Sequence, residues 1–363
     1  MKIKELLDIL NQIAPFFSQE EFDNSGVQFA DLNEDISKIL LCLDVTEEIL
    51  QEAVREQCNV ILSHHPLFFH PFYKITKQDN PVAYQLSVHH INLISMHTNF
   101  DLAENGLNDY VGHVLDLNKV SAIKSSPEKI YKLAVYVPEE YKNTLQDAIF
   151  QSGAGQIGNY SETSFSIAGK GSFKPMDGST PFIGKTGKRE LVNEIKIETI
   201  FYERNLNKII ETIHKAHPYE EPVYDIYQLR AKSTTGIGML AKLKKTQTLE
   251  SFCKKVKKEI GAPYLRIIQS NKKMIQTVAL CTGSGGSLIS QCINKQVDVF
   301  ITGDIDYHEA LKAKETGLNM IDVEHFYTEK LFVPAIRKQL SKYQIPEDIL
   351  VDSQKMNSPF QIL

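Results

Sequence analysis

Blocks of apolar residues alternate with amphipathic segments through the first third of the chain. Apolar runs typical of buried strands span 38–45, 59–63 and 91–96, and helical periodicity spans 47–57 and 81–90. This order predicts a βαβαβ arrangement with a parallel sheet covered by helices. Ligands of open sheets of this kind gather beyond the carboxyl ends of the strands. The residues that follow each apolar run are therefore the first candidates for a functional site.

The pattern changes near residue 126 and returns near residue 236. Between these points the chain predicts strands at 129–138, 194–201 and 223–229, helices at 139–152 and 205–215, and a long exposed excursion at 169–187. Two βαβ-like halves of this size indicate a ferredoxin-like α+β insert over 126–232.

Strands and helices alternate again in the last third. The chain predicts strands at 277–281, 297–301 and 319–323, helices at 287–295 and 307–315, and a closing helix from about 325 to 343. We therefore predict an α/β fold. One discontinuous, sheet-based domain, residues 1–125 and 233–363, is covered by helices and interrupted by the insert of residues 126–232.

The composition is typical of a globular protein, since 42% of the 363 residues are hydrophobic and 23% are charged. An apolar run long enough to span a bilayer and a secretory signal are both missing, which predicts a cytoplasmic protein. The net charge of −5 provides no overall attraction to nucleic acid or to an anionic membrane. The five cysteines include no C-x-x-C pair, which argues against a zinc ribbon and a disulfide framework. We expect them to be small buried apolar residues.

Two adjacent histidines, His64 and His65, directly follow the apolar stretch 60–62. Successive side chains of a strand point to opposite faces, so adjacent histidines bind a single ion only if the backbone turns sharply, as Pro66 would allow. The pair predicts metal ligands at the mouth of a sheet. Its spacing is also compatible with one histidine for each of two neighbouring ions.

A second candidate cluster follows the last predicted strand. His325 and Glu329 stand four residues apart and would share one face of a helix. The alternative is an ordinary first helical turn, with acidic residues near the positive end of the dipole. Together with His64, His65 and Asp101, the two residues complete a nitrogen and oxygen ligand set suited to zinc, iron, manganese or nickel.

Asp101 and His97 follow the third apolar run. A carboxylate can bridge two ions, so we predict that Asp101 is a ligand. His97 is predicted to support it and is a catalytic candidate, although a histidine at the edge of the core is equally compatible with the pattern. His308 is the second catalytic candidate, as a donor or acceptor of protons. Asp304 is interpreted first as a cap of the next helix.

Two further segments have a structural and a functional interpretation. The glycine-rich segment 282–287 joins a strand to a helix, which suits a tight turn or a contact between backbone N–H groups and a substrate phosphate. It lacks the lysine of a G-x-x-x-x-G-K-[ST] loop. The segment 217–222, in the insert, is compatible with a structural turn, a pocket rim or a metal site.

As a set, these motifs resemble those of the NGG-interacting-factor-three family, whose bacterial members are labelled GTP cyclohydrolase I type 2 homologues. The resemblance covers the whole chain. It is carried by residues 22–28, 63–66, 97–101, 106–108 and 302–304, and by His325 with Glu329. In the middle, residues 153–160, 169–175 and 217–222 resemble the inserted domain of the longer bacterial members, which is similar to the CutA and PII-like ferredoxin folds.

The resemblance implies a dinuclear metal centre in which one glutamate is shared between the ions. The ligands would be His64, His65, Asp101, His325 and Glu329. Two divalent ions per subunit are expected, zinc first, with iron, manganese or nickel as alternatives. The resemblance also implies a toroidal homohexamer whose metal sites face an internal cavity.

The family label implies a metal-dependent hydrolase that acts on a nucleotide and opens the imidazole ring of GTP with loss of formate. The motifs define metal ligands rather than guanine contacts, so a second function class stays open: metal storage or delivery, or a regulatory binding protein. Two positions depart from the family pattern. Phe22 stands where many members have tryptophan, and Glu324 precedes His325 where glycine is usual.

Overall fold

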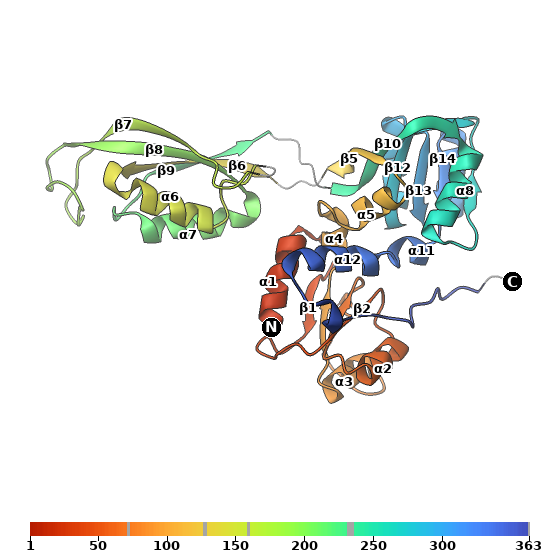
Figure 1. Ribbon diagram of the computed structural model, residues 1–363. Coiled ribbons are helices and arrows are strands. Elements are labelled where there is room, and N and C mark those ends of the chain that lie inside the picture. The colour runs from red at the N-terminus through yellow and green to blue at the C-terminus, as the bar shows by residue number, and fades with distance from the viewer. Residues whose placement is uncertain (71–72, 126–128, 158–159, 231–235, 362–363) are drawn as a thin grey trace. The chain divides into compact units, whose positions relative to one another are not determined.

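The computed structural model describes residues 1–70, 73–125, 129–157, 160–230 and 236–361 (Figure 1). The contacts within the chain divide it into two compact units. The main unit comprises Met1–Ser126 and Thr234–Leu363, and the insert comprises Pro127–Ser233. Each unit has its own sheets and its own apolar core.

The first part of the main unit forms a five-stranded sheet in the order β1-β4-β3-β2-β15, in which only β1 is antiparallel. Its strands are β1 (Gly26–Phe29), β2 (Ile39–Cys42), β3 (Val60–Ser63), β4 (Asn92–Ser95) and β15 (Leu350–Asp352). The three central strands are entirely buried, which confirms the strands predicted from the apolar runs. The edge strands β1 and β15 were not predicted.

Helices cover both faces of this sheet. On one face, α2 (Glu47–Arg55) and α3 (Pro81–Val88) share an apolar cluster with the strands. On the other, α1 (Ile3–Ile13) and α12 (Phe332–Leu340) pack against the strands. Thr46 caps α2, because its hydroxyl accepts a hydrogen bond from the backbone N–H of Ile49 at 3.3 Å.

The second part of the main unit forms a separate six-stranded sheet in the order β11-β14-β13-β12-β10-β5. Its strands are β5 (Asn118–Ser125), β10 (Gly236–Thr248), β11 (Arg266–Ile268), β12 (Met274–Ser284), β13 (Val299–Gly303) and β14 (Asn319–Asp322). The three predicted strands of this region are the parallel ones, β12, β13 and β14. The other three strands pair antiparallel at the margins.

This second sheet also has helices on both faces. One face packs against α9 (Ile289–Asn294) and α10 (Tyr307–Thr316). The other face packs against α5 (Leu107–Val114) and α8 (Leu249–Ile260).

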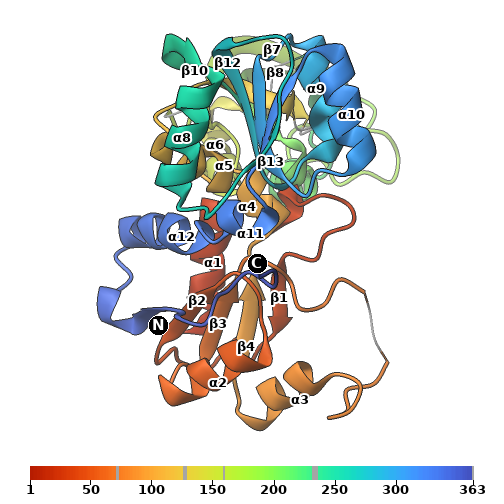
Figure 2. The ribbon, with the colours of Figure 1, turned by 90° about the vertical axis from the view of Figure 1, so that its right-hand side faces the viewer.

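One apolar cluster joins the two sheets of the main unit, since it contains residues of β2 and β3 as well as β12 and β13. Figures 1 and 2 show α12, α4 (Thr98–Leu102) and α11 (His325–Glu329) between the sheets. The prediction of one continuous closing helix is wrong. The chain forms α11, then α12, and then a 3-10 turn at Ser341–Tyr343.

The insert has the order β6-α6-β7-β8-α7-β9 and one antiparallel sheet in the order β7-β8-β6-β9. Its elements are β6 (Ile130–Pro138), α6 (Lys142–Gln151), β7 (Phe165–Phe173), β8 (Glu190–Tyr202), α7 (Leu206–Ala216) and β9 (Tyr224–Leu229). Both helices share an apolar cluster with the sheet. The predicted excursion at 169–187 is partly wrong, because its first five residues belong to β7.

All five cysteines are buried free thiols, as the sequence predicts. Within the described ranges, we find no helix that combines the length and the apolar character needed to cross a bilayer.

Candidate metal centre

The candidate ligands come from three places that are far apart in the sequence. His64 and His65 follow β3, Asp101 lies in α4 just after β4, and His325 and Glu329 begin and end α11. The structure brings all five together in the main unit. His64 and Glu329 are buried, while the other three side chains are partly buried.

Glu329 lies at the centre of the cluster, because its two oxygens face different histidines. Oε1 is 3.8 Å from Nε2 of His64, whereas Oε2 is 2.8 Å from Nε2 of His65 and 2.6 Å from Nε2 of His325. Oδ1 of Asp101 is 3.8 Å from the same nitrogen of His64. One group of donors therefore contains His65 and His325, a second contains His64 and Asp101, and Glu329 belongs to both.

The cluster contains buried nitrogen atoms that ordinary hydrogen bonds do not satisfy. Within the described part of the chain, Nε2 of His64 and Nε2 of His325 are buried and form no hydrogen bond of normal geometry, although both lie near the Glu329 carboxylate. Buried polar atoms in proteins nearly always have a partner. Ligand atoms ~2.1 Å from one zinc ion lie roughly 3.4 Å apart in a tetrahedron, close to the separations around His64. The donor set thus fits divalent cations.

The imidazole rings are held through their other nitrogen. Nδ1 of His64 lies 2.8 Å from the carbonyl oxygen of Met96, and Nδ1 of His65 lies 2.7 Å from Oδ1 of Asp44. Nδ1 of His325 lies 2.7 Å from Oδ2 of Asp304. Carbonyl and carboxylate partners of this kind fix the orientation and tautomer of metal-binding histidines, so that Nε2 presents its lone pair to the cation.

A glycine leaves room for the central carboxylate. Gly283, near the end of β12, has φ +62°, and a Cβ atom there would overlap the Glu329 carboxylate. Its N–H donates to the hydroxyl of Thr328 at 3.0 Å, and the hydroxyl of Thr302 donates to its carbonyl oxygen at 3.0 Å. The glycine-rich segment 282–287 therefore packs directly against the cluster.

Comparison with known proteins places this chain in a family. The model of the Duf34/NIF3 (NGG1p interacting factor 3) family matches residues 1–358. The chain belongs to the Duf34/NIF3 family. This confirms the family expected from the sequence motifs.

Several known proteins resemble the chain over almost its whole length. A Halalkalibacterium halodurans protein named "GTP cyclohydrolase 1 type 2 homolog" is 36% identical over 341 residues, which cover 93% of this chain and 91% of that protein. A Bacillus subtilis protein of the same name is 35% identical over 343 residues, with the same coverage. The crystal structure of a Bacillus cereus protein related to NIF3 superposes with a TM-score of 0.86 at 32% identity, covering 100% of this chain and 99% of that one.

Burial and charge set the electrostatics of the cluster in this Duf34/NIF3 chain. Burial lowers the pKa of His64 to about 4, although Glu329 acts in the opposite direction. Burial also disfavours charge on His65 and His325, yet hydrogen bonds to carboxylates outweigh it and raise their pKa values to about 10 and about 9. These histidines are therefore strongly coupled to the carboxylates that surround them.

The two inward-facing carboxyl groups interact unfavourably with each other. Burial and the charge of Glu329 raise the pKa of Asp101 well above its usual range. Burial has the same tendency at Glu329, but hydrogen bonds from the histidines hold its pKa well below the usual range. A cation between the two carboxylates would offset both the repulsion and the burial cost, which again favours a metal site.

His97 and His308, the two catalytic candidates, lie in different surroundings. A ring nitrogen of His97 lies within 4.8 Å of ring nitrogens of His64 and His65. His308 lies exposed on the first turn of α10, where its ring contacts that of Tyr307 at 5.5 Å between centroids. His308 belongs to none of the three groups of potential ligands, and its catalytic role stays a prediction.

Three carboxylates bond Nδ1 of a histidine in or beside the cluster, and the sequence analysis did not predict this role for any of them. Asp304 was interpreted first as a helix cap, but the residue that caps α10 is Asp306, which accepts a hydrogen bond from the N–H of Glu309 at 2.7 Å. Asp44 and Asp23 were not singled out. The position of Asp44 and Asp304 just beyond β2 and β13 is the one signal that could have identified them.

Glu324, one of the two departures from the family pattern, turns away from the candidate ligands. Its carboxylate accepts hydrogen bonds from the hydroxyls of Tyr264 and Ser358, each at 2.5 Å. The bond from Tyr264 raises the pKa of that phenol to about 12. The backbone of Glu324 has φ +63°, a conformation that glycine adopts without strain.

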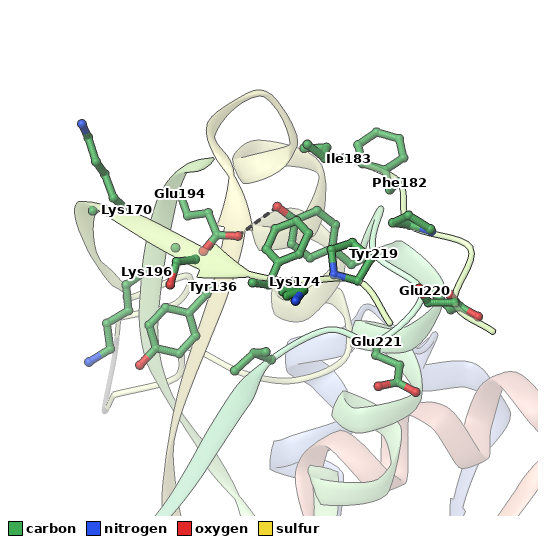
Figure 3. Close-up of a pocket in the computed structure, with 18 of the residues that line it drawn as sticks. Tyr136, Lys170, Lys174, Phe182, Ile183, Glu194, Lys196, Tyr219, Glu220 and Glu221 are labelled. Atoms are coloured by element: carbon green, nitrogen blue, oxygen red, sulfur yellow. Dashed lines mark hydrogen bonds between the residues drawn. The ribbon is translucent and has the colours of Figure 1, made fainter. Parts of the chain in front are cut away.

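A cavity of about 940 Å³ lies in the insert and contains none of the candidate ligands (Figure 3). Tyr219 and Glu194 point toward each other in it and share a hydrogen bond of 2.9 Å. Nearby, Nδ1 of His217 accepts the N–H of Tyr219 at 3.0 Å, and Nε2 bonds the carbonyl oxygen of Tyr136 at 2.8 Å. The segment 217–222 is thus a structural turn at a pocket rim.

Proposed function

We propose that the chain holds a dinuclear metal centre. One cation would be bound by His65, His325 and Glu329, and the other by His64, Asp101 and the second oxygen of Glu329. The observation that carries this proposal is the placement of Glu329, whose two oxygens face different histidines in the middle of the cluster. Nitrogen and carboxylate donors favour zinc, with iron, manganese or nickel as alternatives.

We further propose that the centre performs hydrolysis on a nucleotide, with GTP ring opening and release of formate as the first reaction to test. The support is the name "GTP cyclohydrolase 1 type 2 homolog" of the relatives. Divalent ions supply Lewis acidity and lower the pKa of water, which ring hydrolysis at neutral pH requires. The chain itself orients the ligands. It also excludes solvent on one side, where the ring centroids of Phe332 and His64 are 5.0 Å apart and both side chains are buried.

The proposal extends to the architecture. We propose that the insert is a ferredoxin-like domain, because its βαββαβ order and its sheet order β7-β8-β6-β9 agree with that topology. On the strength of the family resemblance, we also propose a toroidal homohexamer in the cytoplasm. Light scattering on purified protein tests the assembly, and a mass other than that of six chains would contradict it.

Two measurements test the function. Elemental analysis of the purified protein is expected to show two divalent ions per chain. The metal-loaded protein is then incubated with GTP, and the ultraviolet spectrum and released formate are followed. Absence of turnover with zinc, iron, manganese and nickel, together with reversible metal exchange, would reject the hydrolase in favour of metal storage or delivery, or of a regulatory binding protein.

A further inference from the structure

His97 is held in the same way as the proposed ligands, although it is not one of the five. Its Nδ1 lies 2.8 Å from Oδ1 of Asp23, as Nδ1 of His65 lies beside Asp44 and Nδ1 of His325 beside Asp304. Its ring centroid is 5.3 Å from those of both His64 and His65. The chain therefore holds a fourth imidazole at the edge of the cluster.

In the proposed dinuclear centre, neither cation is bound by this fourth imidazole. Nδ1 of His64 and Nδ1 of His65 are engaged by Met96 and Asp44, so each ring offers a single nitrogen, Nε2. In the proposed dinuclear centre, these two nitrogens already belong to the two cations, together with Glu329. His97 shares a potential group only with His64 and His65. Because Asp23 engages Nδ1 of His97, Nε2 is the nitrogen left to face the centre, and neither proposed ligand set uses it.

Asp23 is built to hold His97 rather than to interact with solvent. Its side chain is fully buried, with 0% exposed. While Oδ1 bonds the His97 ring, Oδ2 accepts hydrogen bonds from the hydroxyl of Ser25 at 2.8 Å and from the N–H of Thr98 at 3.0 Å. Burial alone would raise the pKa of this carboxyl, but the bonds from His97 and Thr98 hold it well below its usual range. An ionised carboxylate can only accept, so His97 must donate from Nδ1.

We propose that Asp23 is a positioning residue that fixes His97 in the tautomer with its proton on Nδ1, and that Nε2 of His97 accepts a hydrogen bond from an O–H or N–H group of the molecule bound at the two cations. His97 is not a metal ligand in this arrangement. The inference rests on the proposed dinuclear centre. The His97 side chain is 13% exposed, whereas that of His64 is 0% exposed, so a bound molecule can reach it.

Nuclear magnetic resonance of histidine nitrogens tests the inference on the full chain, labelled with nitrogen-15 in its histidines and loaded with two equivalents of cadmium-113. The rings of His64, His65 and His325 are expected to show coupling to cadmium. His97, assigned by the loss of its signals in His97→Ala, is expected to show a neutral ring with the proton on Nδ1 and no such coupling. Cadmium coupling at His97, or a proton on Nε2, would overturn the inference.

Variants separate positioning from metal binding. His97→Ala is expected to keep two ions per chain by elemental analysis, as is His308→Ala, the control at an exposed histidine. Asp23→Asn is expected to keep the ions but to mix the two tautomers, because an amide can donate as well as accept. Loss of one ion from His97→Ala would show that His97 is a ligand. An unchanged tautomer in folded Asp23→Asn would remove the role of Asp23.

Failure of the proposed dinuclear centre can be distinguished from failure of the inference about His97. Wild-type protein that binds fewer than two ions would contradict that centre, while the tautomer of His97 can still be measured in the metal-free chain. Because the tautomer is measured in the wild-type chain and only its assignment uses His97→Ala, the inference can be tested even if Asp23→Asn does not fold.

Discussion

At the scale of single residues, Glu329 and His97 provide a direct contrast. Glu329 contacts three histidines with two oxygens, whereas His97 lies at the edge of the cluster. We expect Glu329→Ala to lose most of the bound metal, because a shared carboxylate supports both cations, and His97→Ala to retain it. Elemental analysis of both variants checks this. Equal metal content would refute the assignment.

Gly283 offers a second test of the same carboxylate. In Gly283→Ala the new Cβ would overlap the Glu329 carboxylate, and the positive φ would add strain of ~1 kcal/mol. We expect loss of metal together with a lower melting temperature. The matched control is Gly317→Ala, where φ is +81° and a Cβ would meet no described atom within 4 Å. The control should lower stability but keep the metal. Metal retained in both variants would show that Glu329 tolerates displacement.

The sequence was informative about ligands and much less so about the residues behind them. The five candidate ligands could be singled out because they follow apolar runs, where a sheet collects functional groups, and the structure brings them together. Asp23 follows no such run, and its bond to His97 joins residues 74 positions apart. The local pattern of apolar and polar residues does not indicate a contact between residues so far apart in the sequence.

At the scale of elements, burial explains which parts were predicted. The parallel strands β2, β3 and β4 are buried on both faces, so each reads as an unbroken apolar run. β5 is largely exposed, with a polar sequence, and its place in the sheet depends on β10, more than 100 residues later. The break between α11 and α12 was missed because the apolar periodicity continues through it.

Asp298 lies just before β13 and connects it to β12 through hydrogen bonds. These bonds lie at the end of the two strands that is farther from Gly283 and Gly303. Oδ2 of Asp298 accepts the N–H groups of Gln276 and Thr277, at 3.0 and 2.9 Å, and the hydroxyl of Thr277 at 2.7 Å. We expect Asp298→Asn to lower the free energy of unfolding by roughly 1–3 kcal/mol at pH 7, because charged hydrogen bonds are lost. Urea denaturation measures this difference.

The same variant has a defined pH dependence. Burial opposes ionisation of Asp298, but the hydrogen bonds prevail and lower its pKa below the ordinary value of 3.8. Its contribution to stability is therefore fully present above that value and is lost as the pH falls below it, through the lowered pKa of the folded chain. The difference between wild type and Asp298→Asn should stay constant from pH 7 down to about pH 4 and shrink as the pH falls below the ordinary value of 3.8. Asp116→Asn, at an exposed carboxylate paired with Lys244, is the control and should have a smaller effect. A difference that grows on acidification would contradict this role.

At the scale of the whole molecule, the two ends of the main unit that flank the insert belong to neighbouring, paired strands. Ser125 at the end of β5 lies opposite Gly236 at the start of β10 in an antiparallel pair. Two strands paired in this way can be joined by a two-residue turn, and Asn-Gly is the favoured sequence. All five candidate ligands lie in the main unit, outside the insert. We therefore expect the candidate ligands to assemble without the insert.

Replacement of residues 126–235 by Asn-Gly tests this independence. We expect a folded protein with the same number of ions per chain as the full chain, because neither the shared core of the two sheets nor the ligand contacts involve the insert. Circular dichroism and elemental analysis measure the outcome, and the shortened chain with Glu329→Ala is the control that should lose the metal. A shortened chain that folds but binds no metal would show that the insert contributes to the centre. A chain that does not fold would show that the main unit depends on it.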